Sequence, residues 1–260
     1  MLRASRRNLL HGLALGAGGT LLSGCTRVSQ SKWVQDVLYS AEGLTRRVQR
    51  LVAGDALATE YSKADIAPVF RTNGTINPPT KTYQQHVAEG FRNWRVQLGG
   101  LVEHPLSLSV SDLKELPSRT QITRHDCVEG WSCIGEWTGV PLKHLLGMAK
   151  PKRDARYAVF YCADPMDDTD DDGVADSVFY YESHDMLEAM HPQTILAYAL
   201  NGAVLPVANG APVRLRVERQ LGYKQAKFVE RIELVESYAH IAGGKGGYWE
   251  DQGYNWYGGI

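Results

Sequence analysis

Cys127 lies in a charged and aromatic stretch, with Arg124, His125 and Asp126 before it and Glu129 two residues after it. Buried structural thiols favour apolar neighbours, whereas cationic neighbours lower the pKa of a thiol and favour the thiolate. The thiolate is the form that attacks electrophiles and binds metal ions. The stretch therefore predicts that Cys127 is a metal ligand or a nucleophile, with an unpaired structural cysteine as the alternative.

A second segment, residues 209–227, combines basic side chains with glycines and amides. Residues 213–217 alternate in character, so a strand there would place Arg214 and Arg216 on one face. Arginine, lysine and backbone N–H groups are the groups that bind phosphate. Two cations on one face are also ordinary on a solvated sheet, and Lys227 alone is typical of a surface lysine, so both interpretations stay open.

The four cysteines are too few for a disulfide scaffold. Cys127 and Cys133 have none of the usual zinc-ligand spacings, and the C-x-x-C-H motif of covalent haem is missing. A thiol-redox pair formed by these two cysteines is a further hypothesis, although such pairs normally have the C-x-x-C spacing. If Cys25 is lipidated, three cysteines remain, and at least one of them is expected to be unpaired.

The N-terminus has the pattern of an export signal. Arg6 and Arg7 form a twin arginine, and an apolar, glycine-rich run from Leu9 to Gly24 follows. Leu-Ser-Gly before Cys25 is typical of a bacterial lipoprotein cleavage site. Residues 1–25 are therefore predicted to be a twin-arginine signal peptide, and the mature protein is expected in the periplasm, anchored to the membrane by a lipid on Cys25. An ordinary cleaved signal or an uncleaved anchor is the alternative.

The rest of the chain has the size and charge balance of one large domain. The full chain has 28 basic and 29 acidic residues and no basic stripe, so no nucleic-acid partner is predicted. An N-terminal segment, residues 26–69, contains apolar residues at helical spacing, which predict an amphipathic helix at 32–53 that packs on the domain or tethers it. The main domain is predicted at residues 70–237, and residues 238–260 form a tail rich in glycine and aromatic residues.

Short elements are predicted to position these candidate residues. Apolar, β-branched and aromatic stretches predict strands at residues 96–102, 106–110, 157–161, 178–181 and 213–217. Asn201-Gly202 predicts a tight hairpin. Helices are predicted at 142–149, at a short segment capped by Ser111, and at a segment capped by Ser183 that ends near His191. The expected fold class is α+β, with function in the loops.

The acidic run at residues 167–176 has the spacing of a partial calcium-binding loop. Asp168, Asp170 and Asp172 occupy alternate positions before Gly173, which would aim their carboxylates at one cation. The bidentate glutamate of an EF-hand is missing, because Phe179 occupies its position. A calcium site at these three aspartates is one hypothesis, and a solvated acidic loop is the other.

The stretch around Cys127 resembles the cofactor-binding segment of the sulfite oxidase family, the molybdopterin oxidoreductases. The resemblance extends from about residue 70 to residue 237. It is closest to the bacterial periplasmic branch, which includes a methionine-sulfoxide reductase catalytic subunit, because Val-Glu-x-Trp-Ser follows the cysteine there as it does at residues 128–132 here. The resemblance implies the sulfite-oxidase-type fold, with mostly short strands and flanking helices, and it implies that Cys127 binds molybdenum.

The second segment carries the same resemblance. Asn-Gly-Ala-Pro-x-Arg at 209–214 and Gly-Tyr-Lys-x-x-Lys at 222–227 are similar to the family's second cofactor segment. Residue by residue, the resemblance implies that the pterin and its phosphate are held by Asn209, Arg214, Gln225, Ala226 and Lys227.

Three further residues follow from the resemblance. Asn73 matches a family asparagine upstream of the metal cysteine, and Tyr161 is the residue expected to face the pterin from the segment at 161–165. Glu129 is expected near the metal, where it would relay protons or limit access. A structural carboxylate paired with Arg124 is the alternative for Glu129.

The resemblance implies an exported oxidoreductase that catalyses two-electron oxo transfer at a Cys-ligated molybdenum. The branch favours reduction of an S-oxide or N-oxide, a small-molecule substrate that donates its oxygen. Oxidation of sulfite, which accepts oxygen, is the alternative within the family. Electrons are expected from a separate cytochrome or quinone-linked membrane subunit. A metal-free, lipid-anchored binding protein on the same fold is the alternative from another class.

Overall fold

The structure is a computed structural model, and it describes residues 31–54, 56–166 and 178–260. The chain divides into two compact units, Met1–Gly54 and Asp55–Ile260. The predicted signal peptide, the lipid site at Cys25 and the calcium loop at Asp168, Asp170 and Asp172 lie outside the described residues. Among the residues that are described, no group of three His, Cys, Asp or Glu side chains is arranged to hold a metal ion.

Helix α2 (Lys32–Ala53) is the described element of the first unit and confirms the helix predicted from apolar spacing. It ends at Gly54, whose φ of 45° is in the left-handed region that favours glycine. In the parts of the chain that the structure covers, no helix has both the length and the apolar content to cross a membrane.

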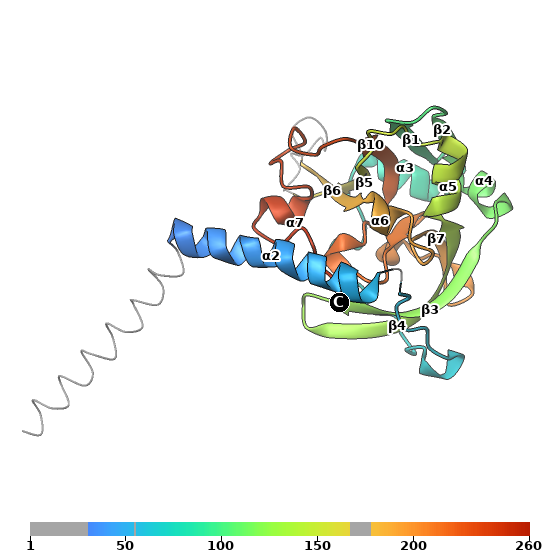
Figure 1. The fold of residues 1–260 in the computed structure, drawn as a ribbon. Helices are drawn as coiled ribbons and strands as arrows, with labels where there is room; N and C mark the ends of the chain where they lie inside the picture. The colour runs from blue at the N-terminus through green and yellow to red at the C-terminus, as the bar shows by residue number, and fades with distance from the viewer. Residues whose placement is uncertain (1–30, 55, 167–177) are drawn as a thin grey trace, which may run out of the picture. The chain divides into compact units, whose positions relative to one another are not determined.

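The first sheet of the second unit has five strands, in the order β2-β1-β10-β5-β6. Strands β1 and β10 run parallel, and the other neighbours are antiparallel (Figure 1). The bounds are β1 (Arg95–Gly100), β2 (Leu106–Ser109), β5 (Tyr157–Pro165), β6 (Phe179–Asp185) and β10 (Val229–Val235). The strands predicted at 96–102, 106–110, 157–161 and 178–181 are therefore confirmed, although β5 and β6 extend further than their apolar cores.

The second sheet is formed around a long hairpin and has the order β3-β4-β7-β8, with β9 paired to β7. Its strands are β3 (Arg119–Cys127), β4 (Trp131–Pro141), β7 (Ile195–Leu200), β8 (Ala203–Val204) and β9 (Arg214–Arg216). Asn201 and Gly202 join β7 to β8 with positive φ angles of 52° and 75°, which confirms the predicted hairpin turn.

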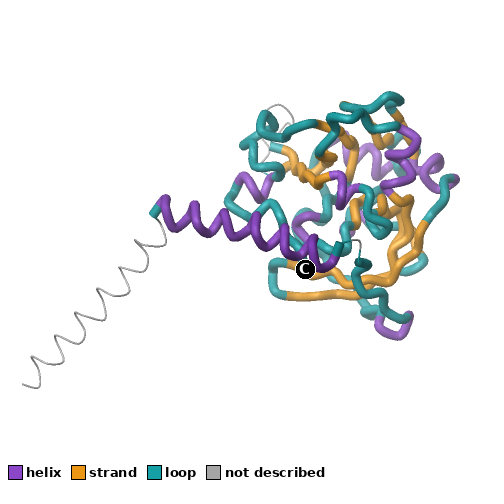
Figure 2. The backbone as a smooth tube through the Cα atoms, viewed as in Figure 1, coloured by secondary structure: helices purple, strands orange, loops and turns teal. Residues whose placement is uncertain are grey.

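Helices in the second unit are short, as Figure 2 shows. They are α3 (Lys81–Ala88), α4 (Val110–Glu115), α5 (Leu142–Ala149), α6 (Met186–Ala189) and α7 (Tyr248–Asp251), with the 3-10 turns η1 (Lys63–Asp65), η2 (Val207–Asn209) and η3 (Gly222–Lys224). Two predicted caps are wrong. Ser109, not Ser111, caps α4, and Asp185, not Ser183, caps α6, because β6 continues through Ser183.

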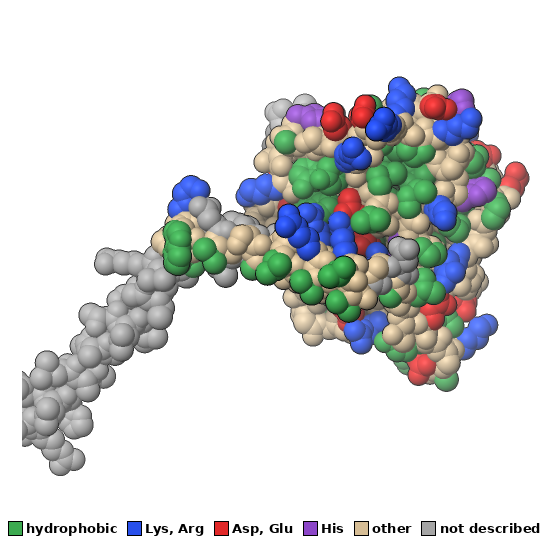
Figure 3. Space-filling model, viewed as in Figure 1, with side chains coloured by type: hydrophobic (Ala, Val, Ile, Leu, Met, Phe, Trp, Pro, Cys, Tyr) green, Lys and Arg blue, Asp and Glu red, His purple; other side chains and the backbone are tan. Residues whose placement is uncertain are grey.

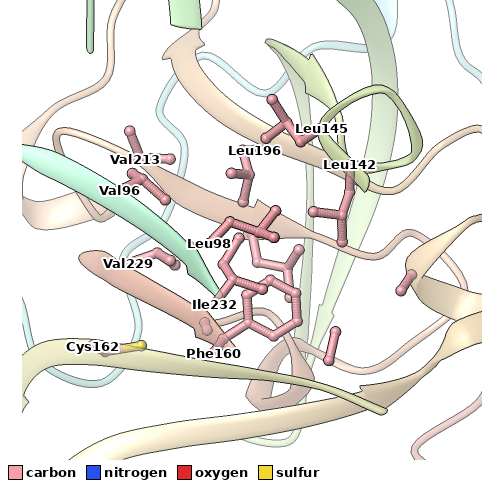
Figure 4. Packing of buried hydrophobic residues seen from close by; sticks show 14 of the residues in the cluster. Val96, Leu98, Leu142, Leu145, Phe160, Cys162, Leu196, Val213, Val229 and Ile232 are labelled. Atoms are coloured by element: carbon pink, nitrogen blue, oxygen red, sulfur yellow. The ribbon is translucent and has the colours of Figure 1, made fainter. Parts of the chain in front are cut away.

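Both sheets and α5 contribute side chains to one apolar core. In Figure 4, Leu98 and Ile232 from the first sheet point toward Leu142 of α5, and Leu196 of β7 lies nearby. All four side chains are buried, and burial of each such side chain contributes roughly 1.5–3 kcal/mol. This core holds the two sheets together, and the predicted α+β fold class is confirmed.

The C-terminal tail, which the sequence left without a predicted structure, is part of the second unit. Backbone bridges join Gly247 to Glu182 of β6 and Gly259 to Gln220. Glu250 of α7 is fully buried. The tail is therefore fixed against the sheet that carries β6.

Candidate active site

The chemistry-bearing residues meet in a pocket of about 200 Å3. Six segments line it. They are residues 73–75, the turn at 127–129 after β3, the end of β5 at Asp164 and Met166, Tyr180 of β6, residues 222–227 around η3, and the tail at Trp249 and Tyr254. The pocket therefore combines both segments singled out in the sequence with a tail that was not expected to take part.

Cys127 enters the pocket because β3 alternates. Its buried face carries Gln121, Thr123, His125 and Cys127, whereas Arg124 is exposed on the opposite face. Cys127 is the last residue of the strand, and the turn to β4 is closed by a hydrogen bond of 3.1 Å from the Gly130 N–H to the Cys127 carbonyl. The thiol is 9% exposed and is unpaired, as are Cys133 and Cys162. No disulfide therefore joins Cys127 to Cys133.

The charged neighbours of Cys127 do not activate it in the way the sequence suggested. Burial raises the pKa of the Cys127 thiol, and this outweighs the backbone hydrogen bond at Glu129 and the charge of Arg71, which both lower it. Arg124 instead pairs with Asp126 at 2.9 Å. Burial and the charge of Arg216 lower the pKa of His125 far below its usual range, so His125 is neutral. The expectation of a lowered thiol pKa is therefore wrong for the cofactor-free pocket.

Glu129 is held by Trp131, not by Arg124. Its carboxylate accepts a hydrogen bond of 2.9 Å from the Trp131 indole N–H. Because Arg124 is engaged with Asp126, the alternative Glu129–Arg124 pair is not formed. Glu129 lines the pocket one residue beyond Val128 and places a carboxylate beside the thiol.

Lys227 and Asn73 meet at another wall of the pocket. The Lys227 ammonium donates to the Asn73 carbonyl at 2.7 Å, to the Ala208 carbonyl at 3.3 Å, and to the Thr75 carbonyl. Burial, followed by the charge of Arg214, lowers the pKa of Lys227 to about 7. The lysine thus ties the loop at 73–75 to the second segment and also lines the pocket.

Arg214 lies behind the pocket wall. It is buried and donates to the backbone carbonyls of Asn209 at 2.9 Å and Gln225 at 3.3 Å. Its guanidinium lies 5.0 Å from the centre of the Trp137 ring, and that of Arg216 lies 4.4 Å from it. The two arginines therefore share one face, as predicted, but that face is buried. Burial, and then the charge of Arg216, lowers the pKa of Arg214 to about 9.

The pocket contains some of the predicted residues and omits others. Its lining includes Asn73, Cys127, Glu129, Gln225 and Lys227. Asn209, Arg214 and Ala226 are buried beside it and are not part of the lining. Gly210, between them, has a φ of 109°, and a Cβ there would lie 2.9 Å from Lys227, so the close approach of these segments requires glycine.

Tyr161 is not brought to the pocket. It lies in the middle of β5, where the guanidinium of Arg231 lies 3.5 Å from the centre of its ring. The same segment instead contributes Asp164 and Met166 to the lining. Burial raises the pKa of Asp164 to about 7. The sequence analysis did not select Asp164, although a single carboxylate in an otherwise apolar strand is a signal that could have identified it.

An aromatic wall completes the pocket and was missed in the sequence. Trp249 and Tyr254 of the tail have ring centres 5.3 Å apart, and Tyr223 contacts Tyr254 edge to face at 5.2 Å. Tyr180 lies in the same lining. No periodic pattern marks Trp249 or Tyr254, because α7 is a single turn and the rest of the tail is irregular.

The side chains around the pocket fit a ligand that combines a soft metal ion, an anionic group and many ring donors and acceptors. Cys127 supplies the soft sulfur ligand. Asp164 Oδ1 and Arg214 Nε are buried and have no hydrogen-bond partner within the described residues. Buried polar atoms of this kind are normally satisfied. Asp164 lines the pocket, so a bound molecule with polar ring edges is expected to meet its carboxyl group, whereas Arg214 lies behind the wall.

Comparisons with known proteins agree with this chemistry. Residues 83–241 match the family described as the oxidoreductase molybdopterin binding domain. The chain is 35% identical over 99% of its length to a candidate protein-methionine-sulfoxide reductase subunit, YedZ1, of Azospira oryzae, covering 88% of that protein. It is 33% identical to the protein-methionine-sulfoxide reductase catalytic subunit MsrP of Ralstonia nicotianae, over 89% of this chain and 69% of the relative.

The chain also has a match among solved structures. The sulfane dehydrogenase SoxCD from Paracoccus pantotrophus overlaps 56% of this chain and 39% of its own, with a TM-score of 0.48 and 26% identity.

Proposed function

The chain belongs to the oxidoreductase molybdopterin-binding domain family, and we propose that it reduces an S-oxide at a molybdenum ion bound by Cys127. The observation that supports this assignment most strongly is the position of one unpaired cysteine, Cys127, in the lining of a pocket that also holds Lys227, Gln225 and Asn73. When bound, the cofactor supplies two-electron oxo transfer, and the protein orients it and tunes its surroundings.

Cys127 is proposed as the protein ligand of the metal. Burial raises the pKa of the Cys127 thiol and favours its protonated form, so binding of the metal would release that proton. Lys227 and the loop at 73–75 would then face the anionic part of the cofactor. Arg214 and Asn209 would support this wall from behind, because Arg214 fixes the backbone of residues 209 and 225.

Glu129 is proposed to handle protons. Reduction of a sulfoxide takes two electrons and two protons and gives a sulfide and water. The Glu129 carboxyl lines the pocket and is oriented by Trp131, so it can pass protons from solvent toward the oxygen that leaves the substrate.

The aromatic wall indicates the substituents of the substrate. Trp249, Tyr254 and Tyr223 form one side of the pocket, and Met166 adds a flexible apolar side chain. Contacts between sulfur and aromatic rings contribute roughly 0.3–1.5 kcal/mol each. We therefore propose an S-oxide with apolar substituents, such as the side chain of oxidised methionine. The relatives from Azospira and Ralstonia carry the name methionine-sulfoxide reductase.

Export and the electron source belong to the same proposal. The twin arginine at Arg6-Arg7 supports export of the folded protein to the periplasm, and Cys25 supports attachment of a lipid there. The names of the relatives describe a subunit and a catalytic subunit. We accordingly propose that a separate quinone-linked or cytochrome subunit in the membrane delivers electrons to this chain.

The test combines metal analysis with a substrate screen. Protein produced with its own signal should contain molybdenum, and with a reduced dye as donor it should reduce methionine sulfoxide faster than dimethyl sulfoxide, nitrate or chlorate. Cys127→Ser should fold and should lose activity by at least about a hundredfold, since it removes the sulfur ligand. Retained activity in this variant would contradict the ligand assignment, and turnover of sulfite in the oxidative direction alone would replace the S-oxide proposal.

A further inference from the structure

Helix α2 exposes an apolar stripe along its whole length. The exposed apolar residues are Trp33, Val37, Leu44, Val48, Leu51 and Val52, from 48% exposed at Val37 to 87% at Leu51. At 100° per residue they occupy one arc of about 100° on the helix surface. Figure 3 shows these apolar side chains gathered along the helix. Single exposed apolar residues are ordinary, but a continuous stripe of this kind marks an interaction surface.

The opposite face of α2 is basic. The helix contains Lys32, Arg46, Arg47 and Arg50 against two acidic residues, Asp36 and Glu42. When they are placed at the same 100° per residue, all four basic residues fall outside the apolar arc. Three of them lie within five consecutive residues, in the last two turns. Positive charge is therefore concentrated beside Val48, Leu51 and Val52.

We propose that α2 lies flat on the surface of an anionic phospholipid bilayer. Helices of this type have an apolar face with tryptophan and leucine, a polar face rich in lysine and arginine, and low overall hydrophobicity. The apolar arc would enter the acyl region, and Trp33 would lie at the headgroup level, where its ring is favoured. The exposed Arg47 side chain would reach past the apolar arc to the lipid phosphates, and the charges of the half-exposed Arg46 and Arg50 would add attraction to an anionic surface.

The width of the apolar stripe and the positive charge of α2 favour binding to a lipid surface over pairing with a second protein helix. A two-helix coiled coil needs only a narrow seam of two positions in every seven residues. The stripe on α2 is wider than that seam, because Trp33 and Val52 lie at opposite edges of the arc. A cluster of arginines matches a surface of lipid phosphates, and each basic residue near such a surface contributes about 1 kcal/mol of attraction.

This surface is independent of the proposed reductase activity and of a lipid on Cys25. A helix bound at the headgroup level would add a second attachment to any lipid anchor, and membrane proteins with stable surface attachment normally combine two such signals. It would also keep the chain in the plane where a membrane-bound electron donor lies.

The test is vesicle flotation with the full chain carrying Cys25→Ser, so that no lipid is attached. The vesicles contain phosphatidylcholine alone or mixed equally with phosphatidylglycerol. The protein should float with the mixed vesicles, and binding should weaken as salt is raised. Arg46→Gln with Arg47→Gln should weaken binding by about fivefold per residue. Leu44→Gln with Leu51→Gln should weaken it by more than about tenfold.

Matched variants separate this proposal from its rivals. Leu44→Met with Leu51→Met, and Arg46→Lys with Arg47→Lys, should bind as the parent does, because apolar character and charge are retained. Equal binding to both kinds of vesicle, or binding unaffected by the glutamine variants, would overturn the proposal and assign attachment to residues before α2. Dimerisation that the Leu44→Gln and Leu51→Gln changes abolish, without vesicle binding, would assign the stripe to a second copy of the chain.

Discussion

Two buried lysines, three residues apart, illustrate opposite uses of a buried charge. Lys224 donates to the carboxylate of Glu250 at 2.5 Å, to the carboxylate of Glu182, and to the Ser183 carbonyl at 3.2 Å. Lys227 donates to three backbone carbonyls. One ammonium therefore contacts two carboxyl groups directly, whereas the hydrogen bonds of the other all go to backbone carbonyls.

The pKa shifts of the two lysines follow this difference. Burial lowers the pKa of Lys224, but the charges of Glu182 and Glu250 outweigh burial and raise it above its usual value. For Lys227, burial and the charge of Arg214 lower the pKa to about 7. Lys224 is thus fixed in the charged state by its partners, whereas the charge of Asp164 only partly offsets the lowering of the Lys227 pKa.

The two environments assign the lysines to different tasks. Lys224 joins η3 to β6 and, through Glu250, to α7 of the tail, so it holds the aromatic wall of the pocket in place. Lys224 itself does not line the pocket. Lys227 lines the pocket, and an anionic ligand would stabilise its charged form. Position in the sequence motif alone does not distinguish these tasks.

The largest effect is expected from Lys224→Met. This change would leave Glu182 and Glu250 buried without a cation, which typically costs about 3–5 kcal/mol. Urea unfolding of the parent and the variant measures the difference in folding free energy. Adding Glu182→Gln and Glu250→Gln to the variant should recover part of the loss, since the buried charges are then removed. An undiminished folding free energy in Lys224→Met alone would show that the network is not structural.

Lys227→Met should act on the cofactor more than on the fold. The variant loses a charge-assisted contact to an anionic group, and such contacts contribute roughly 1.5–3 kcal/mol. The molybdenum content per chain should therefore fall by about tenfold or more. The loss of folding free energy should be smaller than for Lys224→Met, because removing an uncompensated buried charge offsets the three carbonyls that lose their donor. Lys227→Arg is the control and should retain metal. Full metal content in Lys227→Met would remove Lys227 from the site.

The strands and turns of this fold were predictable because their signals are local. Alternation in residues 106–110 and the Asn201-Gly202 pair depend only on neighbouring residues, and both predictions are confirmed. The motifs around Cys127 and Lys227 likewise identified two segments that the fold brings to one pocket. Contact of each carried-over residue with the cofactor stays a prediction.

The remaining features depend on contacts between distant residues. Glu182 and Glu250 are 68 positions apart and meet only through Lys224, so neither looks unusual in the sequence. The wrong expectation of a lowered pKa for the Cys127 thiol also arose because the deciding contacts cannot be read from neighbours in the sequence. Arg124 is close to Cys127 in the sequence, but strand alternation places it on the other face of β3. Sequence proximity therefore gave the wrong electrostatic environment.

A smaller effect is expected in the pH dependence of the folding free energy, which should depend on Lys227 because its pKa is lowered, in contrast to that of Lys224. The folded pKa of Lys227, about 7, is below the ordinary lysine value of 10.5. Above pH 7 the unfolded chain holds this proton and the folded chain does not, so folding stability rises with pH in this range. Between about pH 6 and about pH 8 the gain in cofactor-free protein should be about 1 kcal/mol relative to Lys227→Met.

Asp164 titrates near the same pH and must be controlled. Burial raises its pKa to about 7, so its own contribution to stability falls as the pH rises from about 4 toward 7. Repeating the urea titrations with Asp164→Asn in both chains removes this opposing effect. If the folding free energy still rises with pH in the chain that carries Lys227→Met, a group other than Lys227 is responsible.

The smallest effect is expected from Glu250→Gln. Burial, and then the charge of Glu250, raises the pKa of Glu182 well above its usual range, so the two carboxyls compete for one ammonium. Above the pKa that Glu182 has in the unfolded chain, the unfolded chain releases this proton while folded Glu182 keeps it. The contribution of Glu182 to the folding free energy therefore falls as the pH rises. Glu250→Gln removes part of the repulsion and keeps the Lys224–Glu182 pair. Urea unfolding at neutral pH should change by less than about 1 kcal/mol, with a flatter dependence on pH than the parent between about pH 5 and about pH 7. If Glu250→Gln lowered the folding free energy as much as Lys224→Met does, Lys224 would need both carboxylates ionised. The repulsion between the two carboxyls would then not be the dominant effect at this site.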